Sequence, residues 1–183
     1  MGLEHAAATL YWQAFRAKLG KLLGPESRAI KFFAETINHA AMLAAFENDA
    51  LVGIAAFQNG PDGFSAAGVG DLFRHYGLGA VWRIIPLALL DRRGAAGVLQ
   101  MDGICVRADM RGCGVGTKLL RALFDHARAN GYHGITLDVI DTNPRARALY
   151  ETLGFKTTKV WQTTVMRPLL GFTTATKMTK MLD

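Results

Sequence analysis

The sequence predicts an α/β fold, and the second half of the chain carries the pattern that predicts it. An apolar strand is expected over residues 98–106, and a glycine-rich turn follows it over 111–116. Residues 117–129 then place their apolar side chains on one helical face. A short apolar strand over 135–140 and a helix from Pro144 continue the alternation. Strands that alternate with helices are typical of a sheet covered by helices.

Composition limits the kind of protein. The chain has 183 residues, a net charge of +6 and 50% hydrophobic residues, enough for the core of one domain spanning 1–183. The longest apolar run is far shorter than the ~20 residues that cross a bilayer, and no basic-then-apolar leader opens the chain. Two cysteines without a CxxC pair predict no metal site and a reducing compartment. We therefore expect a cytoplasmic protein without a membrane partner.

The first half of the chain predicts two helices and a hairpin. Apolar residues recur at helical spacing over 6–23 and again over 25–38. Apolar runs at 40–46 and 51–57 enclose the polar Glu47-Asn48-Asp49, which predicts two strands joined by a tight turn.

Residues 60–97 predict an extended insertion. Gly68 and Gly70 favour an irregular segment, whereas 82–90 is strongly apolar and predicts a helix. On the protein surface, a helix of this composition would form an apolar patch that promotes aggregation. We expect it to form a wall of a substrate pocket or the contact of a homodimer.

The glycine run at 112–116 predicts an anion site. Glycine lets the backbone adopt positive φ and approach a ligand, and the following helix adds the partial positive charge of its N-terminus. The P-loop pattern and the dinucleotide fingerprint both need a glycine where Thr117 stands, so neither fits. A tight turn without a ligand is the alternative for the run taken alone.

Two motifs together resemble the GNAT superfamily of N-acetyltransferases. One is Arg-x-x-Gly-x-Gly at 111–116 after the strand Gly-Ile-Cys-Val at 103–106. The other is Asn-Pro-x-Ala-x-x-Leu-Tyr-x-x-Leu-Gly-Phe at 143–155. The resemblance implies a mixed, mostly antiparallel sheet flanked by helices, with one parallel pair that splays apart. The family's usual first strand has only residues 1–5 available here, so it is short, absent or lost.

The resemblance also implies acetyl-CoA as cosubstrate. The arm of the cofactor would pair with the backbone of one strand, and its diphosphate would lie on the turn and the start of the helix. The residues implied are Ile104, Cys105, Val106, Arg111, Gly112, Cys113, Gly114, Val115, Gly116, Thr117 and Asn143. Asn143 could equally cap the helix that Pro144 begins, and both roles can hold at once.

In this family the amine attacks the thioester directly, so the resemblance implies no cysteine nucleophile. Tyr150 matches the family tyrosine that protonates the departing thiolate; packing alone is the alternative. Asp102 is the candidate base. Asp138 and Asp141 flank the neighbouring strand end and stay open as alternatives, as does a structural role for each.

The acceptor is the weakest part of the prediction. Since the sequence shows no acidic cluster, we expect a small-molecule primary amine, with a protein amine as the alternative. A non-catalytic acyl-CoA-binding module is the rival from another class. Nucleic acid is not expected, because Lys and Arg are scattered without interleaved aromatic residues.

Overall fold

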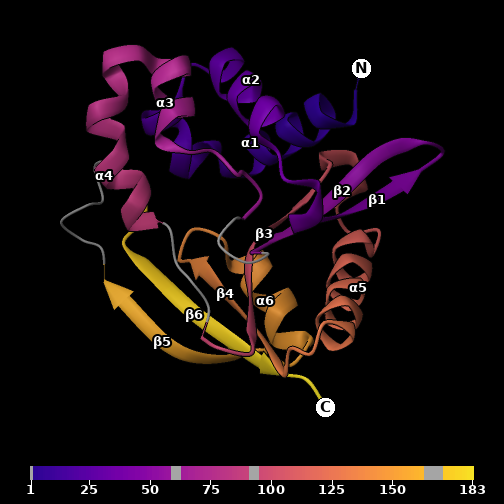
Figure 1. Ribbon diagram of the computed structural model, residues 1–183. Helices are drawn as coiled ribbons and strands as arrows, with labels where there is room; N and C mark the ends of the chain where they lie inside the picture. The colour runs from indigo at the N-terminus through magenta and orange to yellow at the C-terminus, as the bar shows by residue number, and fades with distance from the viewer. Residues whose placement is uncertain (1, 59–62, 91–94, 163–170) are drawn as a thin grey trace.

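The computed structural model describes residues 2–58, 63–90, 95–162 and 171–183. Its described strands form one six-stranded sheet in the order β1-β2-β3-β4-β6-β5 (Figure 1). The strands are β1 Met42–Glu47, β2 Ala50–Phe57, β3 Val98–Val106, β4 Gly134–Ile140, β5 Lys156–Gln162 and β6 Thr174–Met181. β3 and β4 are parallel, and the other neighbouring pairs are antiparallel. The predicted mixed sheet is therefore confirmed.

Helices cover both faces of this sheet (Figure 1). They are α1 Leu3–Leu23, α2 Glu26–Thr36, α3 Val69–Tyr76, α4 Val81–Leu90, α5 Val115–Ala129 and α6 Pro144–Thr152. One core joins α1, α2 and α3 to one face of β2 and β3, and a second joins α5 and α6 to β3 and β4. Leu120 and Leu123 of α5 are fully buried, which contributes about 1.5–3 kcal/mol for each side chain. No helix in the described ranges has the length and hydropathy to cross a bilayer.

The parallel pair separates halfway along its length. Residues 98–101 of β3 pair with residues 134–137 of β4, and the pairing ends there. Beyond that point β3 pairs with β2 and β4 pairs with β6, so each strand keeps its outer neighbour. The predicted splay is confirmed, and it leaves the facing backbone groups of 102–106 without a partner strand on that side.

A β-bulge lies where the two strands part. Gly103 pairs with Ala56 and Met101 pairs with Phe57, so Asp102 has no partner position in β2. Met101 packs into the core under α5, whereas the face of Gly103 lies against Phe15 of α1. Residues two apart normally share a face, so the bulge turns the strand over at Asp102.

Two local predictions are settled by backbone geometry. Among the described residues no strand precedes α1, which begins at Leu3. The irregular segment expected around Gly68 and Gly70 is wrong, because α3 begins directly after Gly68. Asp71 Oδ2 accepts the Gly68 N–H at 3.0 Å, which holds the first turn of α3 despite the glycines.

Candidate active site

The first cavity of the site lies where β3 meets the N-terminus of α5. It measures about 470 Å³. Most of the residues expected to hold the cofactor line it: Ile104, Cys105, Val106, Arg111, Gly112, Gly114, Gly116, Thr117 and Asn143. The local fold explains the grouping, because the turn returns the chain directly beside the strand that it leaves.

Glycine shapes the floor of this cavity. Gly112 and Gly114 have φ of 89° and 81°, a region that side chains disfavour. Gly114 is the N-cap of α5 and offers no capping side chain, and the first helical bond runs from the Lys118 N–H to the Gly114 carbonyl at 3.0 Å. The amides of residues 115–117 precede that bond, so they remain donors for an anion.

Two arginines flank the turn. The Arg111 Nε donates to the Val106 carbonyl at 3.2 Å, which fixes this side chain across the end of β3. Arg145 of α6 also lines the cavity, and a Cβ placed on Gly112 would lie 3.5 Å from its Nη2. Sequence reasoning missed Arg145, although its place after Asn143-Pro144 puts it in the first turn of α6.

Cys113 and Val115 differ from their neighbours in the turn. The Cys113 N–H donates to the Met110 carbonyl at 3.4 Å, and its side chain is exposed outside the described lining. The Val115 side chain is buried with Val52 and Leu119, so only its backbone faces the turn. Of these two residues, Val115 can therefore offer an amide to an anion.

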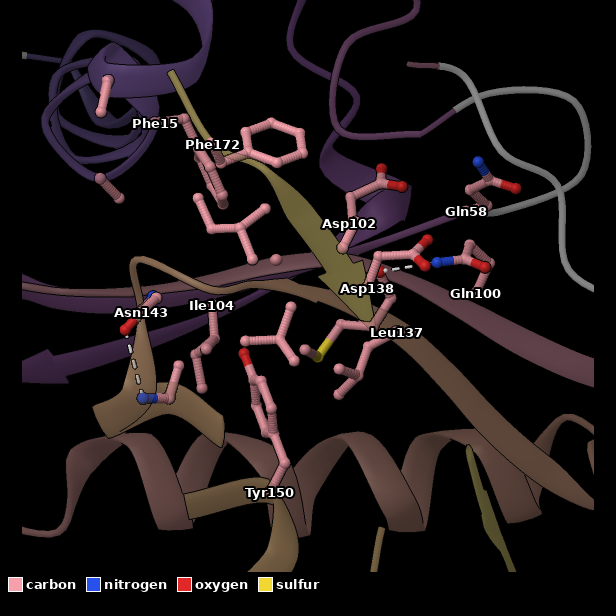
Figure 2. A pocket seen from close by; sticks show the side chains of 18 residues that line it. Phe15, Gln58, Gln100, Asp102, Ile104, Leu137, Asp138, Asn143, Tyr150 and Phe172 are labelled. Atoms are coloured by element: carbon pink, nitrogen blue, oxygen red, sulfur yellow. Dashed lines mark hydrogen bonds between the residues drawn. The ribbon is translucent and has the colours of Figure 1, made fainter. Parts of the chain in front are cut away.

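A second cavity of about 170 Å³ lies between the splayed ends of β3 and β4 (Figure 2). It takes Phe15 from α1, Asp102 from β3, Asp138 from β4, Tyr150 from α6 and Ala175 from β6. These five elements come together only in the folded chain. The two cavities share four lining residues: Ala14, Ile104, Asn143 and Ala146. They are therefore two ends of one cleft.

Tyr150 rises from α6 toward this cleft. Figure 2 shows its hydroxyl pointing into the cavity near Ile104. The side chain is 5% exposed, and its ring lies 5.8 Å from that of Phe155. Burial raises the pKa of Tyr150 above its usual 10, and the nearby Cys105 raises it further. Tyr150 is therefore a neutral hydroxyl donor at physiological pH.

Asn143 stands at the junction of the two cavities. Its Oδ1 accepts the Ala146 N–H at 3.2 Å, so it caps α6 one residue before Pro144 (Figure 2). The cap uses the side-chain oxygen, and the NH₂ group remains a donor on the cleft side. The expected capping role is confirmed, while the cofactor role stays a prediction.

The three candidate carboxylates lie in different settings. Asp102 and Asp138 line the second cavity, and the Asp102 Oδ2 accepts the Phe64 N–H at 3.1 Å. Asp141 lies outside the described lining. It binds the Thr173 hydroxyl and the Thr173 and Thr174 amides, and these hydrogen bonds lower the pKa of Asp141. Asp141 thus ties the end of β4 to the start of β6, which leaves Asp102 and Asp138 as candidate bases.

Several lining residues were missed at the sequence level. They come from distant parts of the chain: Phe15, Gln58, Gln100 and Phe172. The signal for Gln100 is a polar residue between Leu99 and Met101 in an otherwise apolar strand, and it is 5% exposed. The others carry no sequence signal, because only the folded sheet brings them to the cavity.

Neither the cysteines nor the histidines supply a nucleophile or a base here, although Cys105 lines the first cavity. Cys105 is buried, and burial raises the pKa of its thiol, so it is not a thiolate at neutral pH. His126 packs its ring 4.7 Å from that of Phe57, and His133 lies against Gly97. No histidine is among the described residues that line either cavity. The expected wall role of residues 82–90 finds no support, since no described α4 residue lines the cavities.

Comparison with known proteins identifies the family of this chain. The model of the acetyltransferase (GNAT) family matches residues 5–155. An uncharacterized N-acetyltransferase of Schizosaccharomyces pombe is 35% identical over 66 residues, which are 36% of this chain and 40% of that protein. The chain therefore aligns with less than half of that relative.

Solved structures share the whole fold at low identity. A ribosomal-protein-alanine N-acetyltransferase from Brucella melitensis has a TM-score of 0.64 at 17% identity, over 98% of this chain and 94% of that one. An acetyltransferase from Bacillus subtilis, solved in complex with CoA, has a TM-score of 0.53 at 12% identity, over 78% and 76%. These structures share the fold of this chain. Because the family match covers most of the chain, this protein belongs to the GNAT family.

Proposed function

We propose that this chain is an acetyl-CoA-dependent N-acetyltransferase that transfers the acetyl group directly to the primary amine of a small molecule. The whole chain, 1–183, serves as one catalytic domain, and a cytoplasmic setting is part of the proposal. The observation that carries it is the continuous cleft. A glycine turn at the N-terminus of α5 lies at one end, a cavity of about 170 Å³ lined by Tyr150 lies at the other, and Asn143 lines both.

The residues of the turn fit the cofactor's diphosphate. The amides of residues 115–117 point out of the N-terminus of α5, and the guanidinium groups of Arg111 and Arg145 flank them. The side of β3 that faces away from β2 at residues 104–106 fits the amide-bearing arm, since β4 no longer pairs with β3 there. When bound, acetyl-CoA supplies the acetyl group as an activated thioester.

The second cavity supplies the groups for proton movement. Asp102 or Asp138 accepts the proton that the ammonium of the acceptor must lose, directly or through water. The amine nitrogen then forms a bond to the acetyl carbon, and the carbon–sulfur bond breaks. The neutral hydroxyl of Tyr150 donates a proton to the departing sulfur, a role that its burial and raised pKa support. The nitrogen releases its second proton to water, and a proton from water restores the Tyr150 hydroxyl after it has protonated the sulfur.

The size of the second cavity favours a small acceptor over a protein. A cavity of about 150 Å³ holds a molecule the size of benzene, and the volume of the second cavity is similar. A protein amine would insert only one side chain or terminus into such a space, so it is the second candidate.

Calorimetry with coenzyme A, followed by an assay of free thiol release with a panel of amines, tests the proposal. We expect binding and then turnover with small primary amines. Binding without turnover of any amine or peptide would instead support a non-catalytic acyl-CoA-binding module. Absence of binding at millimolar coenzyme A would overturn the assignment altogether.

A further inference from the structure

A pair of lysines lies on the sheet face that leads out of the second cavity, the acceptor end of the cleft. Ala175 of β6 lines this cavity, and Lys177 follows it two residues later on the same face of the strand. On the edge strand β5, Trp161 lies opposite Ala175 and Lys159 lies opposite Lys177. Because cross-strand partners point to the same side of a sheet, these four side chains share one surface. The two lysines therefore lie one row beyond the wall of the cavity.

The ammonium groups of both lysines lie against one aromatic ring. The Lys159 Nζ is 5.4 Å and the Lys177 Nζ is 5.7 Å from the centre of the Trp161 ring, within the range of a cation–π interaction. Trp161 in turn packs against Phe172 and Ala175, which both line the second cavity. The side chain of Lys159 is exposed and that of Lys177 is partly exposed. Two accessible positive charges are therefore held beside the cavity.

The charge of this pair is not neutralised by the part of the chain that the structure describes. No carboxylate in the described ranges forms an ion pair with Lys159 or Lys177. Lys177 lies opposite Asp138 in strand register, but its ammonium lies against Trp161 of the other neighbouring strand. Like charges directly opposite each other on antiparallel strands repel. A carboxylate or phosphate between the two ammonium groups would remove this repulsion and accept their N–H donors.

The sign of the charge changes from the cavity to this surface. The charged side chains among the described lining residues of the second cavity are Asp102 and Asp138, one of which accepts a proton from the acceptor amine in the proposed mechanism. Lys177 lies one strand and Lys159 two strands beyond Asp138, since β6 separates β4 from β5 (Figure 1). Neighbouring strands are about 4.8 Å apart, so an amine beside Asp138 and an anion at the lysines would be about 5–10 Å apart. The arrangement is complementary to a molecule with an amine at one end and an anion at the other.

We propose that the acceptor is an ω-amino acid or ω-amino phosphate, whose amine enters the second cavity and whose anionic group binds Lys159 and Lys177. The inference rests on the proposed N-acetyltransferase function and specifies its substrate class. The distance between the two charges requires a spacer of several carbon atoms, and the Trp161 ring and Ala175 supply apolar surface for it. An α-amino acid does not fit, because its carboxylate is attached to the carbon that bears the amine.

The test compares three amines of similar length with the whole chain and saturating acetyl-CoA. 6-Aminohexanoic acid carries a carboxylate, 6-aminohexyl phosphate carries a phosphate, and 6-aminohexanamide carries no anion. We expect kcat/KM for the better anionic amine to exceed that for the amide by about 3- to 30-fold at low ionic strength. The excess should shrink in about 0.5 M NaCl, because the lysines are accessible to solvent and salt screens them. The anion with the larger kcat/KM identifies the group that the lysines bind. Equal kcat/KM for all three amines, or a preference for the amide, would overturn the inference and leave the N-acetyltransferase function intact.

Variants separate binding of the anion from the chemical step. Lys159→Gln and Lys177→Gln should each lower the ratio of kcat/KM for the anionic amine to that for the amide by about threefold, with unchanged affinity for coenzyme A. Lys31→Gln is the matched control, since it removes the same charge from an exposed lysine of α2 that pairs with Glu35. An unchanged ratio in both lysine variants, or an equal change in the control, would contradict the inference. Binding of coenzyme A without turnover of any amine would instead contradict the proposed function, and the inference with it.

Discussion

The two ends of the cleft are built in different ways. The cofactor end comes mainly from one continuous segment, in which β3, the glycine turn and α5 follow one another from residue 98 to 129. The acceptor end comes from α1, β3, β4, α6 and the start of β6, together with Gln58 after β2. The sequence of one local segment can therefore determine the shape of the cofactor end, whereas the shape of the acceptor end depends on how distant elements pack. We therefore expect changes at the first end to affect cofactor binding and changes at the second to affect catalysis and the acceptor.

Tyr150→Phe should produce the largest effect, because its hydroxyl points into the second cavity as the candidate proton donor. The variant loses the neutral donor while keeping the packing of the ring, so we expect kcat to fall by about 100- to 1000-fold. Affinity for coenzyme A should be unchanged. Tyr132→Phe is the control, since Tyr132 is outside the described cavity lining. A turnover rate within about twofold of the wild type would transfer the proton-donor role to another group.

Gly114→Ala tests whether the glycine turn at the cofactor end of the cleft binds the diphosphate. A methyl group at this positive-φ position meets no protein atom within 4 Å, so it would project into the space for the diphosphate. We expect the Kd for coenzyme A, measured by calorimetry, to rise by about 10- to 100-fold.

Gly131→Ala is the matched control for that variant. Gly131 follows the other end of α5, has φ of 74° and likewise meets nothing within 4 Å, so the backbone strain is similar. If both variants weaken coenzyme A binding equally, strain in α5 and not the phosphate site explains the loss.

Gly103→Ala probes the acceptor end alone. A Cβ here would clash with the Phe15 Cζ, so the Phe15 ring must move within the cavity that it lines. We expect KM for the acceptor to rise by about tenfold without a change in coenzyme A affinity. Adding Phe15→Ala should recover part of this loss, because the clash disappears. Additive effects of the two changes in a double-mutant cycle would contradict the assigned contact.

Asp141→Asn should have the smallest effect, on stability and not on activity. Hydrogen bonds from Thr173 and Thr174 lower the pKa of Asp141 in the folded chain. Its stabilising contribution is therefore present above the unfolded carboxyl pKa of about 3.9 and is lost as pH falls through the lower folded pKa. Urea midpoints should be lower in the variant at about pH 7 and approach those of the wild type as the pH falls through the lowered pKa of the folded Asp141. A constant difference across this range would exclude a role for the charge.

Much of the fold is predictable from the sequence because its signals are local. The helical face of α5, the strand-turn-helix order and the hairpin around Asn48-Asp49 each lie within a short window, and the structure forms all three. The helix at 69–76 was missed because Gly68 and Gly70 suggest a loop. This helix is stabilised at its start by a hydrogen bond from the Gly68 N–H to the Asp71 carboxylate, which composition does not reveal.

The functional site likewise contains residues that local motifs predict and residues that only the folded sheet brings together. The glycine turn and Asn143 follow from motifs, and the structure brings them to one cavity. That Asp102 and Asp138 line one cavity is not predictable, since 36 positions separate them and a bulge determines which face Asp102 presents. Gln100 and Phe172 reach the cavity only through sheet topology.

A crystal structure of the protein with coenzyme A tests the central claim most directly. We predict the diphosphate within about 2.7–3.2 Å of amide nitrogens in residues 114–117 and the thiol between β3 and β4 beside Tyr150. Coenzyme A bound elsewhere, with the space between the splayed strands left to solvent, would contradict the account.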